Sequence, residues 1–360
     1  MNVLLTGGAG YIGSHICIEL MAAGHTVAVL DDFSSCLPDA IERIAHIAGR
    51  APGVYRADVR DFAAVVAALR DSAAQAVIHL AGLKGVPVSF REPQAYFDTN
   101  VTGSATLLRA MTECGVQVLV FSSSATVYGE PHSLPLTEEH RLAPQSPYAR
   151  SKQLVEALLV EKHMADRAWS IGVLRYFNPV GAHSSGWIGE RSSADDTGLM
   201  PSIARVAMGL QSHVEVCGAD FNTPDGTGVR DYLHVVDVAR AHRFALERLA
   251  HAPHWLLANL GRGEGCSVLQ MIRAFERASG KCIPYRIGPR RAGDVGCYYA
   301  DVRKAQALLG WQASLGLTPI CEDVWRWHST SAMLWPQPQE PACHAKYLTK
   351  PKSTPPFATR

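Results

Sequence analysis

The chain has 360 residues, of which 47% are hydrophobic, and a formal net charge of +1 at pH 7. This composition is typical of a globular protein with one large core or two unequal ones, and with no long basic run we expect neither nucleic acid nor an anionic membrane as a partner. The nine cysteines are scattered without C-x-x-C pairs, and no apolar run has membrane-spanning length, so we expect a cytoplasmic protein without signal peptide, disulfide framework or zinc site.

The first predicted elements are a strand, a glycine-rich turn and an apolar helix. Residues 3–5 form the strand, and the turn that follows fits G-x-G-x-x-G with Gly8, Gly10 and Gly13. The missing side chains allow a tight turn and a close approach of the backbone to a pyrophosphate. A second strand at 26–30 ends at Asp31, whose carboxylate can bind a ribose diol and repel a 2′-phosphate. We therefore predict a dinucleotide site that prefers NAD to NADP.

Further strands and helices alternate along the first half of the chain. Strand-like segments lie at 76–80, 118–121 and 171–174, and helices are expected at about 93–114 and 147–164. Such alternation predicts an α/β fold with a doubly wound, Rossmann-like parallel sheet. The later pattern loosens into loops and short elements, as in a smaller mixed α/β lobe. We expect an NAD-binding domain at 1–178, to which some later segments return, a mainly substrate-binding lobe at 179–328 and a flexible tail at 329–360.

Three side chains form a candidate catalytic group. Tyr148 and Lys152 lie one turn apart on a predicted helix, and Ser124 follows the strand at 118–121. A phenol with a pKa of about 10 is a poor base at neutral pH, but neighbouring positive charges favour its ionised form. An isolated Y-x-x-x-K is more often an ordinary amphipathic helix, so the pair gains weight only from the dinucleotide motif. The fifteen histidines form no H-E-x-x-H or similar cluster, and we expect no metal.

Several motifs together resemble the extended short-chain dehydrogenase/reductase superfamily and, within it, the UDP-glucose (UDP-galactose) 4-epimerases, over residues 1–328. They lie at residues 6–15, 79–84, 122–129, 146–152, 175–182, 225–232 and 290–294. The resemblance implies that Tyr148, assisted by Ser124, removes the proton of the sugar 4-hydroxyl while NAD accepts the C4 hydride. The hydride then returns to the opposite face of a 4-ketose. Lys152 would bind the nicotinamide ribose and lower the pKa of Tyr148.

The same resemblance implies a set of cofactor-binding residues: Gly7, Gly10, Tyr11, Ile12, Gly13, Asp31, Asp58, Val59, Leu80, Ala81, Gly82, Lys84, Thr99 and Phe177. It also implies a UDP-sugar substrate held by Ser124, Asn178, Leu199, Arg230, Arg291, Asp294 and Tyr298. The chain departs from the family pattern where Gly198 precedes Leu199 in place of an Asn, and where Cys217 replaces an aromatic beside the uracil. A bulky Tyr298 suggests poor use of N-acetylated sugars. By analogy we expect a homodimer formed through helices near 94–114 and 147–164.

Three alternatives remain open. A 4-epimerase of another nucleotide sugar, a uronate or a pentose, would use the same motifs. A nucleotide-sugar 4,6-dehydratase would need an Asp-Glu pair where this chain has Ala125 and Thr126, whose side chains cannot eliminate water. A non-catalytic NAD-binding scaffold would have no reason to keep Ser124, Tyr148 and Lys152 together.

Overall fold

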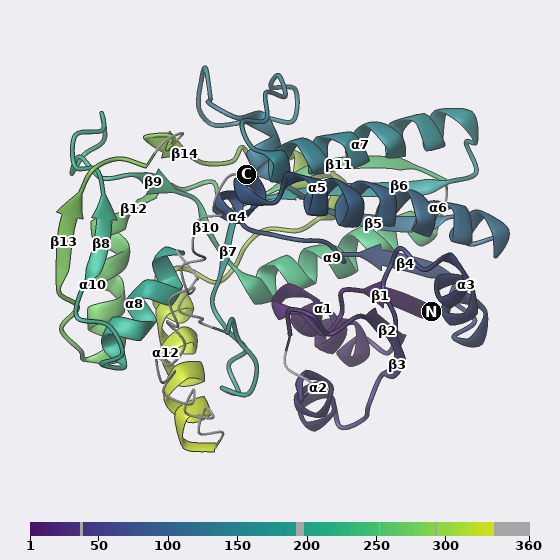
Figure 1. Ribbon diagram of the computed structural model, residues 1–360, viewed down its shortest axis with the longest axis horizontal. Coiled ribbons are helices and arrows are strands. Elements are labelled where there is room, and N and C mark those ends of the chain that lie inside the picture. Colours follow the sequence, from purple (N-terminus) through teal and green to yellow (C-terminus); the bar gives the residue numbers. More distant parts are fainter. Residues whose placement is uncertain (37–38, 192–197, 252, 292–293, 335–360) are drawn as a thin grey trace, which may run out of the picture.

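The computed structural model describes residues 1–36, 39–191, 198–251, 253–291 and 294–334. Its main feature is a seven-stranded sheet in which every neighbouring pair is parallel, with the order β11-β6-β5-β4-β1-β2-β3 (Figure 1). These strands are β1 (Asn2–Thr6), β2 (Thr26–Asp31), β3 (Gly53–Arg56), β4 (Ala76–His79), β5 (Val118–Ser124), β6 (Ser170–Tyr176) and β11 (Trp255–Leu260). The predicted doubly wound α/β fold is confirmed, and the order is that of a dinucleotide-binding sheet with one more strand.

Helices cover both faces of this sheet. One face carries α1 (Tyr11–Ala22), α2 (Ala40–Ala48), α9 (Val235–Ala250) and α11 (Arg303–Leu309), and the other carries α3 (Phe62–Asp71), α6 (Gly103–Glu113) and α7 (Pro147–Ala165). The consecutive residues Leu4 and Leu5 of β1 belong to two separate buried clusters. Successive side chains of a strand point to opposite faces, so a strand buried on both sides is apolar throughout.

The helix predicted at 93–114 is interrupted. It consists of α5 (Pro93–Tyr96), a π-helical turn at Phe97–Thr102 and then α6, and it follows the short helix α4 (Val86–Arg91). A wider π turn displaces the side chains that follow it and is common at functional sites. Here Asn100 lies within that turn.

The smaller lobe lies at one end of the large sheet, on the left of Figure 1. Its strands pair as β7 (Asn178–Val180) with β10 (Tyr232–His234), as β12 (Cys266–Ser267), β9 (Val229–Arg230) and β14 (Cys297–Tyr298) in that order, and as β8 (Val214–Cys217) with β13 (Tyr285–Gly288). Its helices are α8 (Leu199–Ala207), α10 (Val268–Ser279) and α12 (Leu317–Leu334). These elements enclose a buried cluster of their own.

The chain passes between the two lobes more than once. After β10, α9 packs against α1, and β11 then extends the large sheet by pairing with β6 over all six of its residues. At the other end, α12 runs to Leu334, so residues 329–334 of the expected tail are helical. Residues 335–360 lie outside the described residues.

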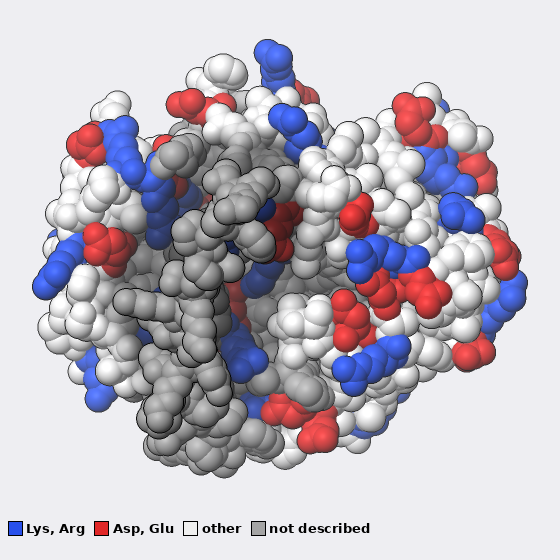
Figure 2. All heavy atoms as spheres, in the orientation of Figure 1, with Lys and Arg blue, Asp and Glu red and all other residues white. Residues whose placement is uncertain are grey.

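Basic and acidic side chains are interspersed on the face drawn in Figure 2. In the part of the chain that the structure describes, no helix is both long enough and apolar enough to cross a bilayer. The same residues contain no group of three or more His, Cys, Asp or Glu side chains that could hold a metal ion.

Candidate active site

The glycine turn joins β1 to α1, and its glycines have different reasons to lack a side chain. Gly7 has a φ of 70°, and a Cβ there would lie 2.7 Å from the backbone nitrogen of Ala81. A Cβ on Gly13 would lie 2.2 Å from the carbonyl oxygen of Gly7. Around Gly10, by contrast, the only atom within 4 Å of such a Cβ is that same oxygen, at 3.4 Å. Gly7 and Gly13 are therefore required by the turn itself, whereas Gly10 keeps space open outside it.

The first turn of α1 faces this open space without a side-chain cap. Gly10 is its N-cap residue and provides no side-chain hydrogen bond. A helix N-terminus attracts anions through its unpaired N–H groups and its dipole. The hydroxyl of Tyr11 donates to the carbonyl of Gly181 at 2.7 Å, so Tyr11 would contact a pyrophosphate through its backbone, as would Ile12. Together with the cradle at Gly10, this turn fits the diphosphate of NAD.

Asp31, at the end of β2, lies directly beside the turn. Its carboxylate accepts hydrogen bonds from the backbone N–H groups of Ala9 at 3.0 Å and Phe33 at 2.9 Å. Burial raises the pKa of Asp31, and these two hydrogen bonds oppose that rise. The backbone thus fixes this carboxylate at the end of β2, next to the glycine turn.

Asp58 and Val59 follow β3 at the same edge of the sheet. The N–H of Ala57 donates to the carbonyl of Asp31 at 3.1 Å, which holds this segment beside β2. The carboxylate of Asp58 forms an ion pair with Arg60 at 2.5 Å, and this pairing lowers the pKa of Asp58. Val59 is buried, and a Cβ on Gly103 of α6 would lie 2.6 Å from its side chain.

The loop after β4 lies against the end of β1. The N–H groups of Leu80 and Ala81 both donate to the carbonyl of Thr6, at 3.0 and 3.1 Å. A Cβ on Gly82 would lie 2.8 Å from Oδ1 of Asn100. That oxygen accepts from the N–H of Leu83 at 2.7 Å. Asn100, the neighbour of Thr99, is directed to this loop by the π turn.

Ser124 and Tyr148 are brought together by β5 and α7. Ser124 ends β5, while the hydroxyl of Ser146 caps α7 by accepting from the N–H of Ala149 at 3.1 Å. Burial raises the pKa of the Tyr148 phenol, and a hydrogen bond with Ser124 and the charge of Lys84 oppose this rise. The ring of Tyr96 packs edge-on against that of Tyr148, with centroids 6.2 Å apart. The phenol therefore has a hydroxyl partner and a nearby cation.

Lys152 lies one turn after Tyr148 in α7 and is buried. Its ammonium donates to the carbonyl of Ser122 at 3.0 Å and lies 4.9 Å from the centre of the Phe121 ring. Burial lowers its pKa to about 8, and the charge of Glu156 opposes that fall. In this structure the cation that acts on the pKa of Tyr148 is Lys84 rather than Lys152.

Lys84 connects the loop after β4 to the smaller lobe. Its ammonium lies 2.9 Å from a carboxylate oxygen of Glu190 and 5.8 Å from the centre of the Tyr11 ring. The lysine side chain is 70% exposed, so this ion pair is easily exchanged for another partner. Glu190 carries no recognisable signal in the sequence, since it belongs to none of the motifs.

Behind the catalytic group, a buried network ties α7 to the ends of β5 and β6. The guanidinium of Arg175 pairs with Glu156 at 2.6 Å and donates to the hydroxyl of Tyr128 at 3.0 Å. The hydroxyl of Ser123 donates to the same carboxylate. Glu156 belongs to none of the sequence motifs, although its position four residues after Lys152, on the same helical face, is a usable signal.

On the substrate side, β14 lies next to the turn that follows Ser124. Tyr298 pairs with Arg230 in the register of β14 and β9, and its hydroxyl donates to the carbonyl of Ala125. Its ring packs on Phe177 with centroids 5.3 Å apart. Arg230 lies 3.4 Å from the carboxylate of Asp294. The structure thus groups Phe177, Arg230, Asp294 and Tyr298, and Tyr298 reaches the turn that follows Ser124.

The remaining substrate candidates are more dispersed. Asn178 begins β7, and its N–H donates to the carbonyl of Asp231 at 3.1 Å. Leu199 begins α8 directly after Gly198, which is the N-cap residue, and Arg291 is exposed in the loop after β13. Cys217 ends β8 and is partly buried.

We expect Gly10→Ala to separate folding from cofactor binding. The new methyl group meets no side chain of the protein, so the free energy of unfolding should change by less than about 0.5 kcal/mol. Because the methyl group enters the cradle, NAD should bind roughly tenfold or more weakly. Chemical denaturation and fluorescence titration measure the two effects. Gly53→Ala, where the Cβ makes an ordinary 3.5 Å contact, should alter neither, and unchanged NAD binding by Gly10→Ala would contradict the assignment.

Lys152→Met should stabilise the cofactor-free protein at pH 7. The lysine is charged below its folded pKa of about 8, so its burial costs stability throughout that range. Above pH 8 the folded protein releases the proton before the unfolded chain does, and the cost falls towards the unfolded pKa of about 10.4. Thermal unfolding from pH 7 to pH 10 should show an advantage of at least about 1 kcal/mol for the variant, shrinking as the pH rises. A less stable variant at pH 7 would refute this.

The fold and the geometry agree with three comparisons. Residues 3–261 match the family model described as the NAD dependent epimerase/dehydratase family. The UDP-glucose 4-epimerase of Bacillus subtilis (strain 168) is 47% identical over 331 residues, which cover 92% of this chain and 98% of that protein. The Homo sapiens UDP-glucose 4-epimerase is 46% identical over 333 residues, covering 91% of this chain and 96% of that protein.

Solved structures give the same result. The structure of a UDP-glucose-4-epimerase from Stenotrophomonas maltophila, with bound NAD and formylated UDP-arabinopyranose, superposes with a TM-score of 0.91 at 47% identity and covers 92% of this chain and 99% of that one. The Bifidobacterium longum enzyme in complex with NAD⁺ and UDP has a TM-score of 0.88 at 43% identity, with 92% and 98% covered. The chain therefore belongs to the NAD dependent epimerase/dehydratase family, among the UDP-glucose 4-epimerases.

Proposed function

We propose that the chain catalyses the reversible C4 epimerisation of a UDP-hexose, interconverting UDP-glucose and UDP-galactose with NAD as its cofactor. The observation that carries this proposal is that the buried phenol of Tyr148 lies beside Ser124, which opposes the rise of its pKa, at the sheet edge that also holds the glycine turn. A proton-transferring group beside a dinucleotide cradle is what oxidation of a sugar alcohol requires.

Tyr148 is the general base that takes the proton of the sugar 4-hydroxyl on its phenolic oxygen. Ser124 holds that oxygen by a hydrogen bond, and the charge of Lys84 favours the phenolate. Bound NAD supplies the acceptance and return of the C4 hydride. When the hydride returns, Tyr148 gives the proton back, so each turnover leaves the protonation state of the protein unchanged.

The cofactor is held at both ends by groups from the carboxyl edge of the sheet. The first turn of α1 binds the diphosphate, and Asp31 binds the adenine ribose. Lys152 reaches the nicotinamide ribose by exchanging the carbonyl of Ser122 for a ribose hydroxyl, which its flexible stem allows. We assign Asp58, Val59, Thr99 and Phe177 to the walls of this site.

The substrate is held mainly through its diphosphate and uridine. The 4-ketose can therefore rotate about its link to the diphosphate between the two hydride transfers. Arg230 and Arg291 suit the diphosphate because a guanidinium can donate two parallel hydrogen bonds to one oxyanion. Asn178, Leu199 and Asp294 line the path to them. Tyr298 is fixed by Ala125 and Phe177, and we propose that its rigid ring disfavours N-acetylated sugars.

A UDP-pentose is the second candidate substrate. The specific reason is that the Stenotrophomonas maltophila structure, at 47% identity, contains formylated UDP-arabinopyranose. A 4,6-dehydratase is disfavoured because Ala125 is buried, and the hydroxyl of Thr126 donates to Ser124 at 3.0 Å instead of providing an acid and a base. A scaffold would not need the phenol and its serine partner.

We further propose that the protein is a cytoplasmic homodimer. All eight described cysteines are free, which fits a reducing compartment. Helix α7 exposes apolar side chains on its outer surface, with Leu154 43% and Met164 58% exposed. Exposed apolar side chains on one helical surface are typical of an interface with a second helix. We also assign 1–178, together with α9 and β11, to the NAD-binding lobe and most of 179–328 to the substrate lobe.

Purified protein incubated with UDP-galactose, without added cofactor, should produce UDP-glucose. Tyr148→Phe should bind NAD normally and lose about 10²-fold or more of kcat, because it lacks the proton-transferring oxygen. Tyr285→Phe, an exposed tyrosine remote from the group, is the control and should keep full activity. Near-normal turnover by Tyr148→Phe would remove this residue as the base. Faster turnover of UDP-arabinopyranose than of UDP-galactose would favour the second candidate.

The assembly is tested by placing charges on the outer surface of α7. Leu154→Glu with Met164→Glu should convert the dimer to a monomer, because four buried carboxylates per interface cannot all be solvated. Light scattering after size-exclusion chromatography measures the mass. Leu210→Glu, a 75% exposed leucine just beyond α8, should leave the mass unchanged. A wild-type protein that is monomeric at all concentrations would contradict the proposal.

A further inference from the structure

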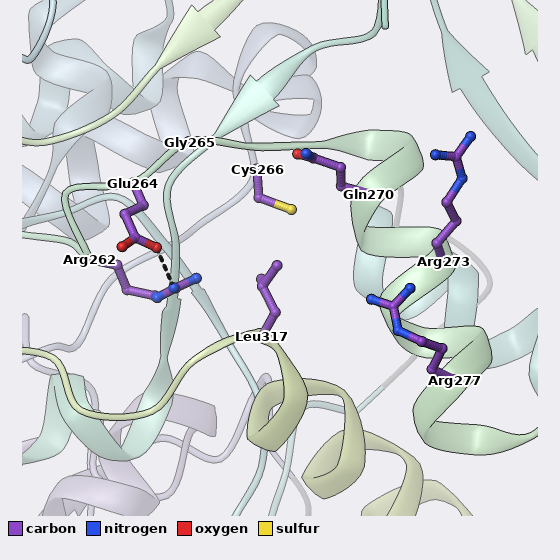
Figure 3. Close-up of a pocket in the computed structure, with 8 residues that line it drawn as sticks. All are labelled: Arg262, Glu264, Gly265, Cys266, Gln270, Arg273, Arg277 and Leu317. Carbon is purple, nitrogen blue, oxygen red and sulfur yellow. Dashed lines mark hydrogen bonds and ion pairs between the residues drawn. The ribbon is translucent and has the colours of Figure 1, made fainter. Parts of the chain in front are cut away.

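A cavity of about 350 Å³ lies in the smaller lobe. None of its lining residues is among those assigned above to the catalytic, cofactor or substrate site, although Cys266 pairs with Arg230 in the register of β12 and β9. The cavity is enclosed by the loop 262–265 and β12, by α10 and by the first residue of α12 (Figure 3). The loop carries Arg262 and Glu264 on one side, and α10 carries Gln270, Arg273 and Arg277 on the other. Cys266 and Leu317 lie between them.

The lining is strongly basic, with three arginines and one carboxylate. Arg262 pairs with Glu264 at 2.6 Å. Arg273 and Arg277 lie one turn apart on the same face of α10, both exposed, and neither forms an ion pair with a described residue. Like charges at this spacing repel each other. Against the effect of burial, hydrogen bonds from Ser267 and Thr227 lower the pKa of Asp225, and the charge of Arg273 adds to that effect. The described carboxylates therefore offset the positive charge of the cavity only in part.

The two residues between these walls, Cys266 and Leu317, carry no negative charge that would repel an anion. Cys266 is buried, and burial raises the pKa of its thiol to about 11, so the sulfur is neutral at physiological pH. Leu317 is apolar. Glu264 is 71% exposed and already paired, so it offsets only one of the three guanidiniums.

The loop that forms one wall is rigidly held. The N–H groups of Arg262 and Gly263 donate to the carboxylate of Asp231, at 2.7 and 3.0 Å. The hydroxyl of Ser267, the N-cap of α10, donates to Asp225 at 2.5 Å. Both walls of the cavity are thus fixed by hydrogen bonds before any ligand enters, which lowers the ordering cost of binding.

We propose that this cavity binds a diphosphate group as a second anion site, separate from the catalytic cleft. A guanidinium can donate two parallel hydrogen bonds to the oxygens of one phosphate group. Three guanidiniums around one cavity therefore suit an anion with several charges better than they suit a single carboxylate. The volume accepts a free diphosphate and also leaves room for a nucleoside attached to it. The proposal does not depend on the catalytic role of Tyr148.

Isothermal titration calorimetry of the NAD-loaded protein with inorganic pyrophosphate tests this site. The affinity is compared between variants that remove positive charge and a variant that removes negative charge from the lining. Arg273→Gln with Arg277→Gln should weaken binding at this site roughly tenfold or more, since two charge-assisted contacts are lost. Glu264→Gln should strengthen it several-fold, because Arg262 is then released from its carboxylate partner. Arg248→Gln, an exposed arginine at the end of α9, is the control and should have no effect.

Epimerisation measured without pyrophosphate should be the same in the wild type and all of these variants, which reports that the catalytic cleft is intact. A parallel titration with ADP separates the two forms of ligand: tighter binding than pyrophosphate, lost in the double arginine variant, identifies a nucleoside diphosphate. Equal binding of pyrophosphate and ADP identifies a free diphosphate. If the double arginine variant and Glu264→Gln both bind pyrophosphate as the wild type does, the proposal is refuted.

Discussion

The parallel pairing of β1, β4, β5 and β6 is the constraint on which the site depends. Parallel strands end at a common edge, so the glycine turn after Thr6, the loop after His79 and the hydroxyl of Ser124 meet although they are far apart in the sequence. The first turn of α7 reaches the same edge because Ser146 caps that helix and Pro147 occupies its first position. A shift of one strand by a single residue would turn Ser124 away from Tyr148.

Burial disfavours the ionised forms of both Tyr148 and Lys152. It raises the pKa of Tyr148 and lowers that of Lys152. Only Lys84 and Ser124 act on the phenol in the other direction. A positively charged nicotinamide ring would add to them, which couples the strength of the base to occupancy of the cofactor site.

The local elements of this fold can be predicted from sequence, because buried strands, glycine turns and capped helices leave patterns over a few residues. The strand at 26–30 and the helix at 147–164 are examples, since the structure has them at 26–31 and 147–165. Contacts between distant segments leave no such pattern. The pairing of Lys84 with Glu190, over 106 residues, depends on how the two lobes meet.

Two further differences have local physical causes. The π turn at 97–102 depends on one additional residue within a helical turn, which periodicity cannot resolve. It directs the side chain of Asn100 to the loop after β4. The ammonium of Lys152 donates to the carbonyl of Ser122, because a buried cation needs a hydrogen-bond acceptor. The proximity of Ser124 and Tyr148 was predictable from the family resemblance. The pairing of Glu156 with Arg175 joins α7 to β6, and the motifs do not include it.

The return of α9 and β11 to the large sheet makes the two halves of the molecule inseparable. A fragment ending at Asn178 would leave β6 as an unpaired edge strand and would uncover the apolar surface of α1 that α9 buries. Such a fragment would self-associate rather than persist as a dinucleotide-binding module. Recombination or gene fission in this protein can therefore succeed only at cuts that keep residues 235–260 with the N-terminal half.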